Sequence, residues 1–215
     1  MSPICTIAGQ EIRDGFKNHW IIVLTLIVIG FSLSLAFLGS APGGSVGTSS
    51  LLVTVVSLSS LTIFLIPLMG LMLSYDSLGS DIERGIMIIL LSYPVNRWQI
   101  IIGKFLGHIT ILAFSITIGY LTAGVIVSYS SNSIDYENWT IFVFMIISSI
   151  VLGGTFLSIG YLISSCVKDR SMAGGIAIGI WLFLVLVYDM ALLGLIVSYE
   201  DIFNEYIFNI LLLIN

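Results

Sequence analysis

The sequence predicts an all-α polytopic bundle of transmembrane helices. Of its 215 residues, 58% are hydrophobic and 9% are charged, and the mean hydropathy is +1.12, whereas about a quarter of the residues in a soluble domain are charged. The apolar segments are continuous and do not alternate in the way that the strands of a membrane barrel do. Helices satisfy their own backbone hydrogen bonds in lipid. We therefore expect residues 1–215 to form one transmembrane domain.

The uncharged stretches place the membrane helices. No Asp, Glu, Lys or Arg occurs over residues 18–75, which is long enough for two crossings of about 20 residues with a Gly- and Ser-rich turn between them. Two further stretches, 105–134 and 138–167, are also uncharged. Residues 199–215 contain only a short apolar run, below the length of a crossing, so we expect them to lie along the surface or to begin a further element. The five predicted membrane helices are 20–38, 51–74, 100–127, 139–165 and 173–198.

Residues 3–18, before the first crossing, predict an amphipathic helix at the inner membrane interface. Polar residues such as Gln10 and Arg13 fall away from its apolar stripe, which is the pattern of a helix lying in the interface plane. A simple topogenic lead with positive charges fits the same residues. The apolar positions recur every four residues, at Ile4, Ala8, Ile12, Phe16 and Trp20.

All Lys and Arg residues fall on one side of the predicted helices. The loops on the other side, 39–50 and 128–138, contain neither residue type. Because short cytosolic loops carry an excess of Lys and Arg, we expect a cytosolic N-terminus and a place in the cell membrane. With 12 Asp+Glu against 7 Lys+Arg, the chain offers no basic surface for nucleic acid, and the lipid bilayer is its expected surrounding. The basic residues are Arg13, Lys17, Arg84, Arg97, Lys104, Lys168 and Arg170.

Residues 76–98, between the second and third predicted membrane helices, are the most informative polar segment. Its apolar core, 86–91, is too short to cross a membrane, and Gly85 and Pro94 at its ends each break or end a helix. We expect a short interfacial helix, a break, and then the start of the third membrane helix. Its charged ends suit a rigid lever driven by a cytosolic partner, although a purely structural elbow fits equally. The candidate coupling residues are Asp81, Glu83, Arg84, Gly85, Tyr93, Pro94 and Arg97.

Two ionisable side chains fall within the predicted membrane helices. Asp189 lies on the fifth helix, where an ionised carboxylate costs roughly 2.5–3.5 kcal/mol unless it is paired, hydrated or protonated. It is either a gate or substrate-pathway residue or a buried acid that hydrogen-bonds across helices. For His108, one turn after Lys104, we prefer interfacial hydrogen bonding over metal ligation. Candidate partners for Asp189 are Ser115, Thr117, Ser158 and Tyr161.

Small residues at a spacing of four mark where membrane helices can approach closely. Gly103 and Gly107 lie on the third predicted helix, and Gly175 and Gly179 lie on the fifth. Such pairs allow backbone contact where no hydrophobic effect drives helices together. They do not identify the partner, which is either another helix of the chain or a second copy.

The sequence contains no motif for ATP binding or catalysis. Gly103 and Lys104 lack both the earlier Gly and the following Ser or Thr of a phosphate-binding loop, and no metalloprotease or nucleophile-elbow pattern occurs. Cys5 and Cys166 form neither a CxxC pair nor a zinc-ligand spacing. We therefore predict a protein that is not an enzyme and has no cofactor or metal site. An intramembrane enzyme is the alternative of another class.

The sequence of the loop after the second membrane helix resembles that of type-2 ABC transporter permeases. The resemblance rests on residues 83–85 (ERG), an aliphatic stretch, and then residues 91–97 (LSYPVNR) and 103–104 (GK). Ile86 stands where this family usually has Thr. Further stretches resemble the permeases of the system that matures the copper enzyme nitrous oxide reductase: 11–15 (EIRDG), parts of 64–76 (FLIPL and LSYD), 103–108 (GKFLGH) and 188–195 (YDMALLGL).

The resemblance implies six membrane helices and a separate ATPase on which this loop docks. On that basis we expect a permease homodimer that works with two copies of the ATPase in nitrous oxide reductase maturation, together with an extracytoplasmic copper-maturation protein. The chain ends at Asn215, where such relatives continue towards a sixth helix, so we expect it to be incomplete. The alternatives are a type-2 exporter permease for a drug, lipid or other substrate, and a membrane scaffold without transport activity.

Overall fold

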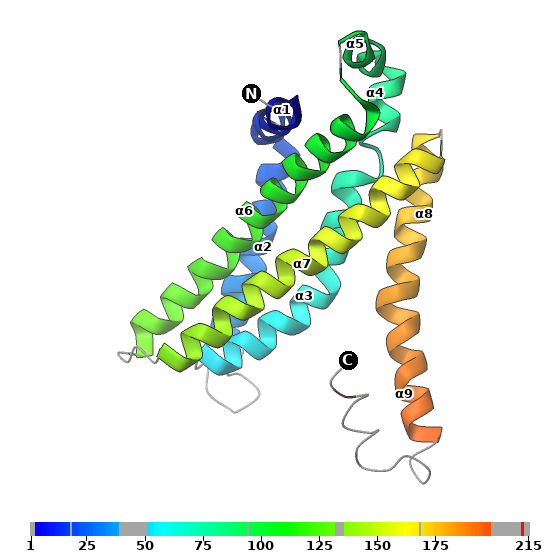
Figure 1. Ribbon diagram of the computed structural model, residues 1–215. Coiled ribbons are helices and arrows are strands. Elements are labelled where there is room, and N and C mark those ends of the chain that lie inside the picture. Colours follow the sequence, from blue (N-terminus) through cyan, green and yellow to red (C-terminus); the bar gives the residue numbers. More distant parts are fainter. Residues whose placement is uncertain are drawn as a thin grey trace.

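The computed structural model of the chain describes residues 3–17, 19–38, 51–93, 95–131, 136–167, 169–198 and 212. Over these residues it contains helices and no strand (Figure 1), which confirms the predicted all-α fold class. The elements are α1 (Pro3–Lys17), α2 (His19–Leu38), α3 (Leu51–Ser74), α4 (Gly79–Glu83), α5 (Ile86–Ser92), α6 (Arg97–Ser131), α7 (Tyr136–Cys166), α8 (Arg170–Leu182), the π-helix η2 (Phe183–Val187) and α9 (Tyr188–Ser198).

Four helical stretches of the described chain are long and apolar enough to cross a membrane. The helices α1 and α2 form a bent pair, in which Pro3–Lys17 and Ile22–Phe37 differ in direction by 70°. Counting this pair as one span raises the number of candidate crossings to five. The chain is therefore a multi-pass membrane protein. The four candidates are Val53–Glu83, Arg97–Tyr129, Asn138–Cys166 and Arg170–Ile196.

Helices α2, α3, α6 and α7 pack against one another and form the bundle (Figure 1). Between membrane helices, close packing and hydrogen bonds do most of the stabilising, because lipid tails are as apolar as the side chains of the core. In this core the Tyr120 hydroxyl lies 2.7 Å from Thr62 Oγ1. Fully buried side chains around it include Leu58, Ile66, Phe142 and Leu157.

Helices α3 and α7 cross closely at two glycines. A Cβ added at Gly70 would lie 2.8 Å from the carbonyl oxygen of Gly153 and 3.1 Å from the backbone nitrogen of Leu157. These are backbone atoms that cannot move aside cheaply, so the approach requires a residue without a side chain. The crossing point of α3 and α7 is therefore fixed by the sequence.

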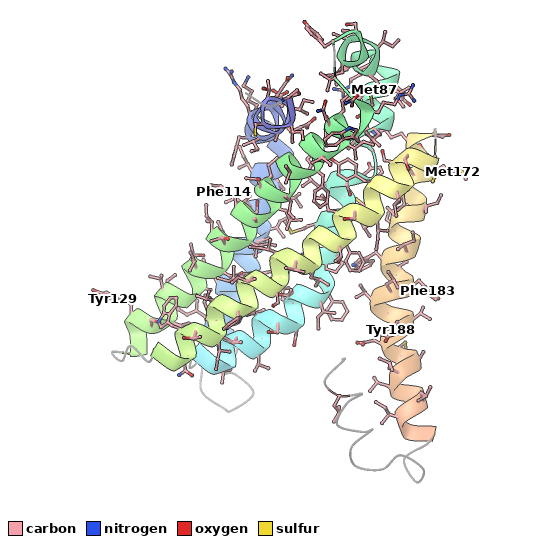
Figure 2. All side chains as sticks on the ribbon, in the orientation of Figure 1. Met87, Phe114, Tyr129, Met172, Phe183 and Tyr188 are labelled. Carbon is pink, nitrogen blue, oxygen red and sulfur yellow. The ribbon has the colours of Figure 1, made fainter. Side chains whose placement is uncertain are left out.

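The stretch from α8 to α9 extends away from the bundle at its far end (Figure 1). The indole nitrogen of Trp181 donates to the carbonyl oxygen of Phe64 at 3.0 Å and so attaches α8 to α3. Beyond this point Phe183 and Tyr188 are exposed, and Figure 2 shows both on the separated stretch. The π-helix η2 joins α8 to α9, and its wider turns interrupt the α-helix.

One end of the bundle collects every Lys and Arg that the structure describes. This end is formed by α1, α4, α5, the start of α6 and the junction of α7 with α8 (Figure 1). We call it the basic end. It is the end that the sequence predicts to face the cytosol.

Candidate functional site

The predicted coupling loop forms two short helices at the basic end, where the sequence predicted one. Helix α4 ends at Glu83 and α5 begins at Ile86, and Gly85 between them has a φ of 71°. This left-handed conformation costs an L side chain about 1–2 kcal/mol, whereas glycine adopts it freely. Gly85 thus allows the chain to change direction between α4 and α5.

The exposed side chains of this segment include both large apolar groups and charged groups. Four apolar side chains are between 62% and 75% exposed: Ile82, Ile88, Ile89 and Tyr93. An exposed apolar patch bordered by polar groups is typical of a protein interaction site. Pro94 lies outside the described residues. We call the four apolar residues, together with the exposed Glu83, Arg84 and Arg97, the coupling surface.

On the inner side of α4, Lys104 of α6 lies between two carboxylates. Its Nζ is 2.6 Å from Glu11 Oε1 of α1 and 2.7 Å from Asp81 Oδ2 of α4. The same Nζ donates to the Ser77 carbonyl oxygen at 3.5 Å. The Lys104 side chain is 6% exposed, and a pair buried to this extent is screened much less by salt than a surface pair. One ammonium group therefore joins α1, α4 and α6.

His108 lies one turn further along α6 and reaches α7. Its Nδ1 is 2.6 Å from the Tyr161 hydroxyl, and its Nε2 is 3.6 Å from Glu11 Oε2. The Tyr161 hydroxyl also accepts from Ser77 Oγ at 3.4 Å. His108 is thus a hydrogen-bonding residue at the edge of the ionic cluster. Across the described residues, no group of three or more His, Cys, Asp or Glu is placed to hold a metal ion.

The segment between α3 and α4 is attached to α7 and α8. Asp76 Oδ2 lies 2.8 Å from Arg170 Nε at the start of α8. The backbone nitrogen of Leu78 donates to Ser164 Oγ of α7 at 2.9 Å. The first turn of α8 is capped by Asp169, whose carboxylate accepts from the backbone of Ser171 at 3.0 Å. The root of the coupling segment is therefore held by side chains from both helices.

Helix α1 lies against the start of α6 along the glycine pair that the sequence marks for close packing. A Cβ added at Gly103 would lie 2.8 Å from Ile7 Cβ, and one added at Gly107 would lie 2.5 Å from Glu11 Cβ. Both distances are shorter than ordinary van der Waals contact. The partner of Gly103 and Gly107 is thus the N-terminal amphipathic helix of the same chain.

A cavity of about 370 Å³ opens between α1, the α4–α5 segment and the start of α6. Its lining is rich in polar and charged side chains, so α1 and the coupling segment face each other across a polar space. At its edge the Lys104 ion pairs bridge the two elements. Besides the ionic cluster, the polar lining residues include Gln10, Asp14, Ser80, Arg84 and Arg170.

The other predicted residues lie on α8 and α9. Asp189 is half-buried in the first turn of α9, and within the described chain no hydrogen bond or ion pair joins it to another residue. Two of its candidate partners are engaged elsewhere, since Ser115 hydrogen-bonds to α2 and Tyr161 to α6. A Cβ at Gly175 or Gly179 would meet nothing within 4 Å, so a packing role for this pair stays a prediction that requires a further segment or a second copy.

Glu11, Lys104 and Tyr161 carry the network, yet the sequence predicted neither Glu11 nor Lys104 as a site residue and named Tyr161 only as a candidate partner for Asp189. Glu11 had a signal in the sequence, because it lies one turn after the apolar Ile7 in the amphipathic helix predicted over residues 3–18. Lys104 and His108 are four residues apart, so a helix places both on one face. Tyr161 carried no comparable signal.

Comparison with known proteins identifies the family. The family model described as "ABC-2 family transporter protein" matches residues 5–215. The chain belongs to the ABC-2 transporter family. It is 38% identical over 217 residues to a protein of Stutzerimonas stutzeri named "Probable ABC transporter permease protein NosY", and 37% identical over 216 residues to a protein of the same name from Pseudomonas aeruginosa PAO1. Each alignment covers 100% of this chain and 78% of the relative.

Membership confirms the predicted resemblance and gives the chain a general role. It is a membrane-spanning permease subunit of an ABC transporter, and such a transporter includes an ATPase in addition to the permease. The described residues at the basic end then acquire a functional context, because a permease requires a place where the ATPase acts on it.

Proposed function

We propose that this ABC-2 permease receives the work of ATP hydrolysis through the coupling surface on α4 and α5. The supporting observation is the combination of an exposed apolar surface with a fixed root. Tyr93 and the exposed isoleucines offer a contact area for a partner, while Asp76 and Leu78 attach the segment to α8 and α7. A force applied at the surface therefore reaches the membrane helices through short contacts.

In this proposal the basic end faces the cytosol, and residues 1–215 act as one transmembrane domain in the cell membrane. Two permease copies work with two copies of the ATPase. The placement of all Lys and Arg on one side supports the orientation. The exposed stretch from α8 to α9, with Gly175 and Gly179 free of close contacts among the described residues, offers a surface on which a second copy can pack.

We further propose that the transporter takes part in the maturation of nitrous oxide reductase, alongside an extracytoplasmic copper-maturation protein. The support is the agreement between the sequence resemblance to permeases of this system and the full-length match to two proteins named NosY. In a strain that lacks the permease gene, nitrous oxide reductase should accumulate without its full copper content. Restored copper content without any form of this permease would contradict the assignment.

Two substitutions test the coupling role. Glu83→Lys reverses an exposed charge of the coupling surface, and Gly85→Val forces a β-branched residue into the left-handed conformation. Both should reduce the stimulation of the co-purified ATPase while leaving membrane insertion intact. Arg13→Glu, which also reverses an exposed charge but on α1 and outside the lining of the cavity, is the control and should leave stimulation unchanged. Full stimulation in both test variants would remove the assignment of coupling to α4 and α5.

A further inference from the structure

The Lys104 cluster connects the coupling segment to an element that lies outside the coupling surface. Asp81 belongs to α4, whereas Glu11 belongs to α1, and the two carboxylates share one ammonium group. Asp81 and Lys104 are 9% and 4% exposed as whole residues. The Asp81 side chain therefore points away from the coupling surface and into the contact with α1 and α6.

Helix α1 is held against α6 by more than this ion pair. The glycine pair brings the α1 backbone close to α6: a Cβ at Gly103 would lie 3.1 Å from the Ile4 carbonyl oxygen, and one at Gly107 would lie 3.2 Å from the Ala8 carbonyl oxygen. Further along both helices, the rings of Phe16 and Phe114 meet edge to face with centroids 5.0 Å apart. Contacts spaced along α1 make it and the first half of α6 one rigid unit.

We propose that Lys104 is a positioning residue that locks α4 to this unit, so that displacement of the coupling segment carries α1 with it. The polar cavity lies between α1 and the coupling segment, and residues of both elements line it. The two ion pairs of Lys104 form a short link between these elements, at 2.6 Å and 2.7 Å. The inference rests on the proposed coupling role of α4 and α5 and adds α1 to the moving parts.

The charges explain why the lock depends on Lys104. Two carboxylates brought together repel each other, and a shared cation turns that repulsion into attraction for both. Without the ammonium group, the carboxylates of Glu11 and Asp81 would repel each other across the contact between α1 and α4. In the buried setting the pairs are weakly screened, so the lock should persist at physiological salt.

A distance measurement tests the lock directly. Spin labels at Gln10 of α1 and Ser80 of α4, which both line the cavity, report the separation of the two elements once Cys5 and Cys166 are replaced by Ser. The complex with its co-purified ATPase should give one narrow distance distribution that is the same without nucleotide and with a non-hydrolysable ATP analogue. A distance that changes with nucleotide in the otherwise unmodified chain would overturn the proposal.

A variant that keeps folding intact tests the consequence for coupling. Lys104→Met alone leaves the buried Asp81 and the half-buried Glu11 without their shared cation and is expected to destabilise the protein. We therefore combine it with Glu11→Gln and Asp81→Asn, since a buried ionic group replaced as a whole by neutral residues is commonly tolerated. This triple variant should co-purify with the ATPase, give a broad Gln10–Ser80 distance distribution, and lose roughly 2- to 30-fold of ATPase stimulation.

A rescue experiment separates positioning from mere stability. Lys104→Glu combined with Asp81→Lys keeps two acids and one base in the cluster and should restore both the narrow distance distribution and most of the stimulation. Full stimulation in the triple variant, or no recovery in the exchanged variant, would overturn the proposal. If Glu83→Lys loses stimulation while the triple variant keeps it fully, the lock is refuted but the proposed role of the coupling surface stands. If Glu83→Lys and Gly85→Val both keep full stimulation, the coupling role itself is refuted.

Discussion

Replacing Gly107 by Ala tests whether the contact of α1 with α6 holds the two helices together. The added Cβ would lie 2.5 Å from Glu11 Cβ and 3.2 Å from the carbonyl oxygen of Ala8, while carbon atoms in good contact are about 3.5–4.0 Å apart. Helix α1 must therefore move away by about 1 Å, which is enough to forfeit a quarter to a half of the dispersion attraction at the affected contacts.

The free-energy cost follows from a comparison of two variants. Overpacking of this kind costs about 1–3 kcal/mol, whereas Ala in place of Gly within a helix gains about 0.8–1.0 kcal/mol. Gly30→Ala in α2 has the same propensity gain, and its Cβ would meet nothing within 4 Å among the described residues. The difference in unfolding free energy between the two variants should thus equal the packing cost at Gly107, about 1–3 kcal/mol.

The assay is unfolding of the purified permease in mixed micelles by increasing fractions of a denaturing detergent, followed by helix content and by a fluorophore on Cys5 of α1. Cys166, which is also exposed, is replaced by Ser so that only Cys5 is labelled. Gly107→Ala should lower the midpoint relative to Gly30→Ala and should release the α1 fluorophore first. Equal midpoints in the two variants would refute the claim that α1 is fixed through this glycine.

Three further outcomes follow from the structure. Cysteines introduced in 76–97 should react with membrane-impermeant reagents only from the cytosolic side and those in 128–138 only from outside, and the reverse pattern would overturn the orientation. Asp189→Asn should preserve folding but impair the transport or maturation cycle. If the Asp189→Asn variant functions fully while the Asp189→Leu variant fails to fold, Asp189 is a structural hydrogen-bonding residue. Tyr161→Phe should destabilise the bundle by about 1–3 kcal/mol, because it leaves a buried histidine nitrogen without its partner, whereas Tyr93→Phe at an exposed position should have no effect on the same titration.

The fold class was predictable because lipid imposes a strong constraint on composition. A charged side chain in a membrane helix is costly, so uncharged stretches such as 18–75 reveal helices before any detail of packing is known. The break at Gly85 was visible for a similar reason, since a six-residue apolar run cannot cross a bilayer. These inferences depend on local properties of the chain.

The ionic cluster was harder to predict from the sequence, because it forms between residues that are far apart along the chain. Lys104 could be assigned to a loop or helix end from sequence, but its carboxylate partners come from α1 and α4, which lie far from it along the chain. Gly103 and Gly107 illustrate the same limit. Their spacing predicted a close contact, and only the fold revealed that α1 is the helix that fills it.

The π-helix η2 has a consequence for how the last membrane stretch presents its side chains. A π-type turn closes with one more residue than an α-turn, so residues after Val187 are rotated as if a residue had been inserted, by about 100°. A helical wheel drawn continuously from Arg170 therefore assigns Asp189 to the wrong face. Deleting one residue within Phe183–Val187 would remove this offset and turn the carboxylate by about a quarter of a revolution, without altering the chemistry of any side chain around it.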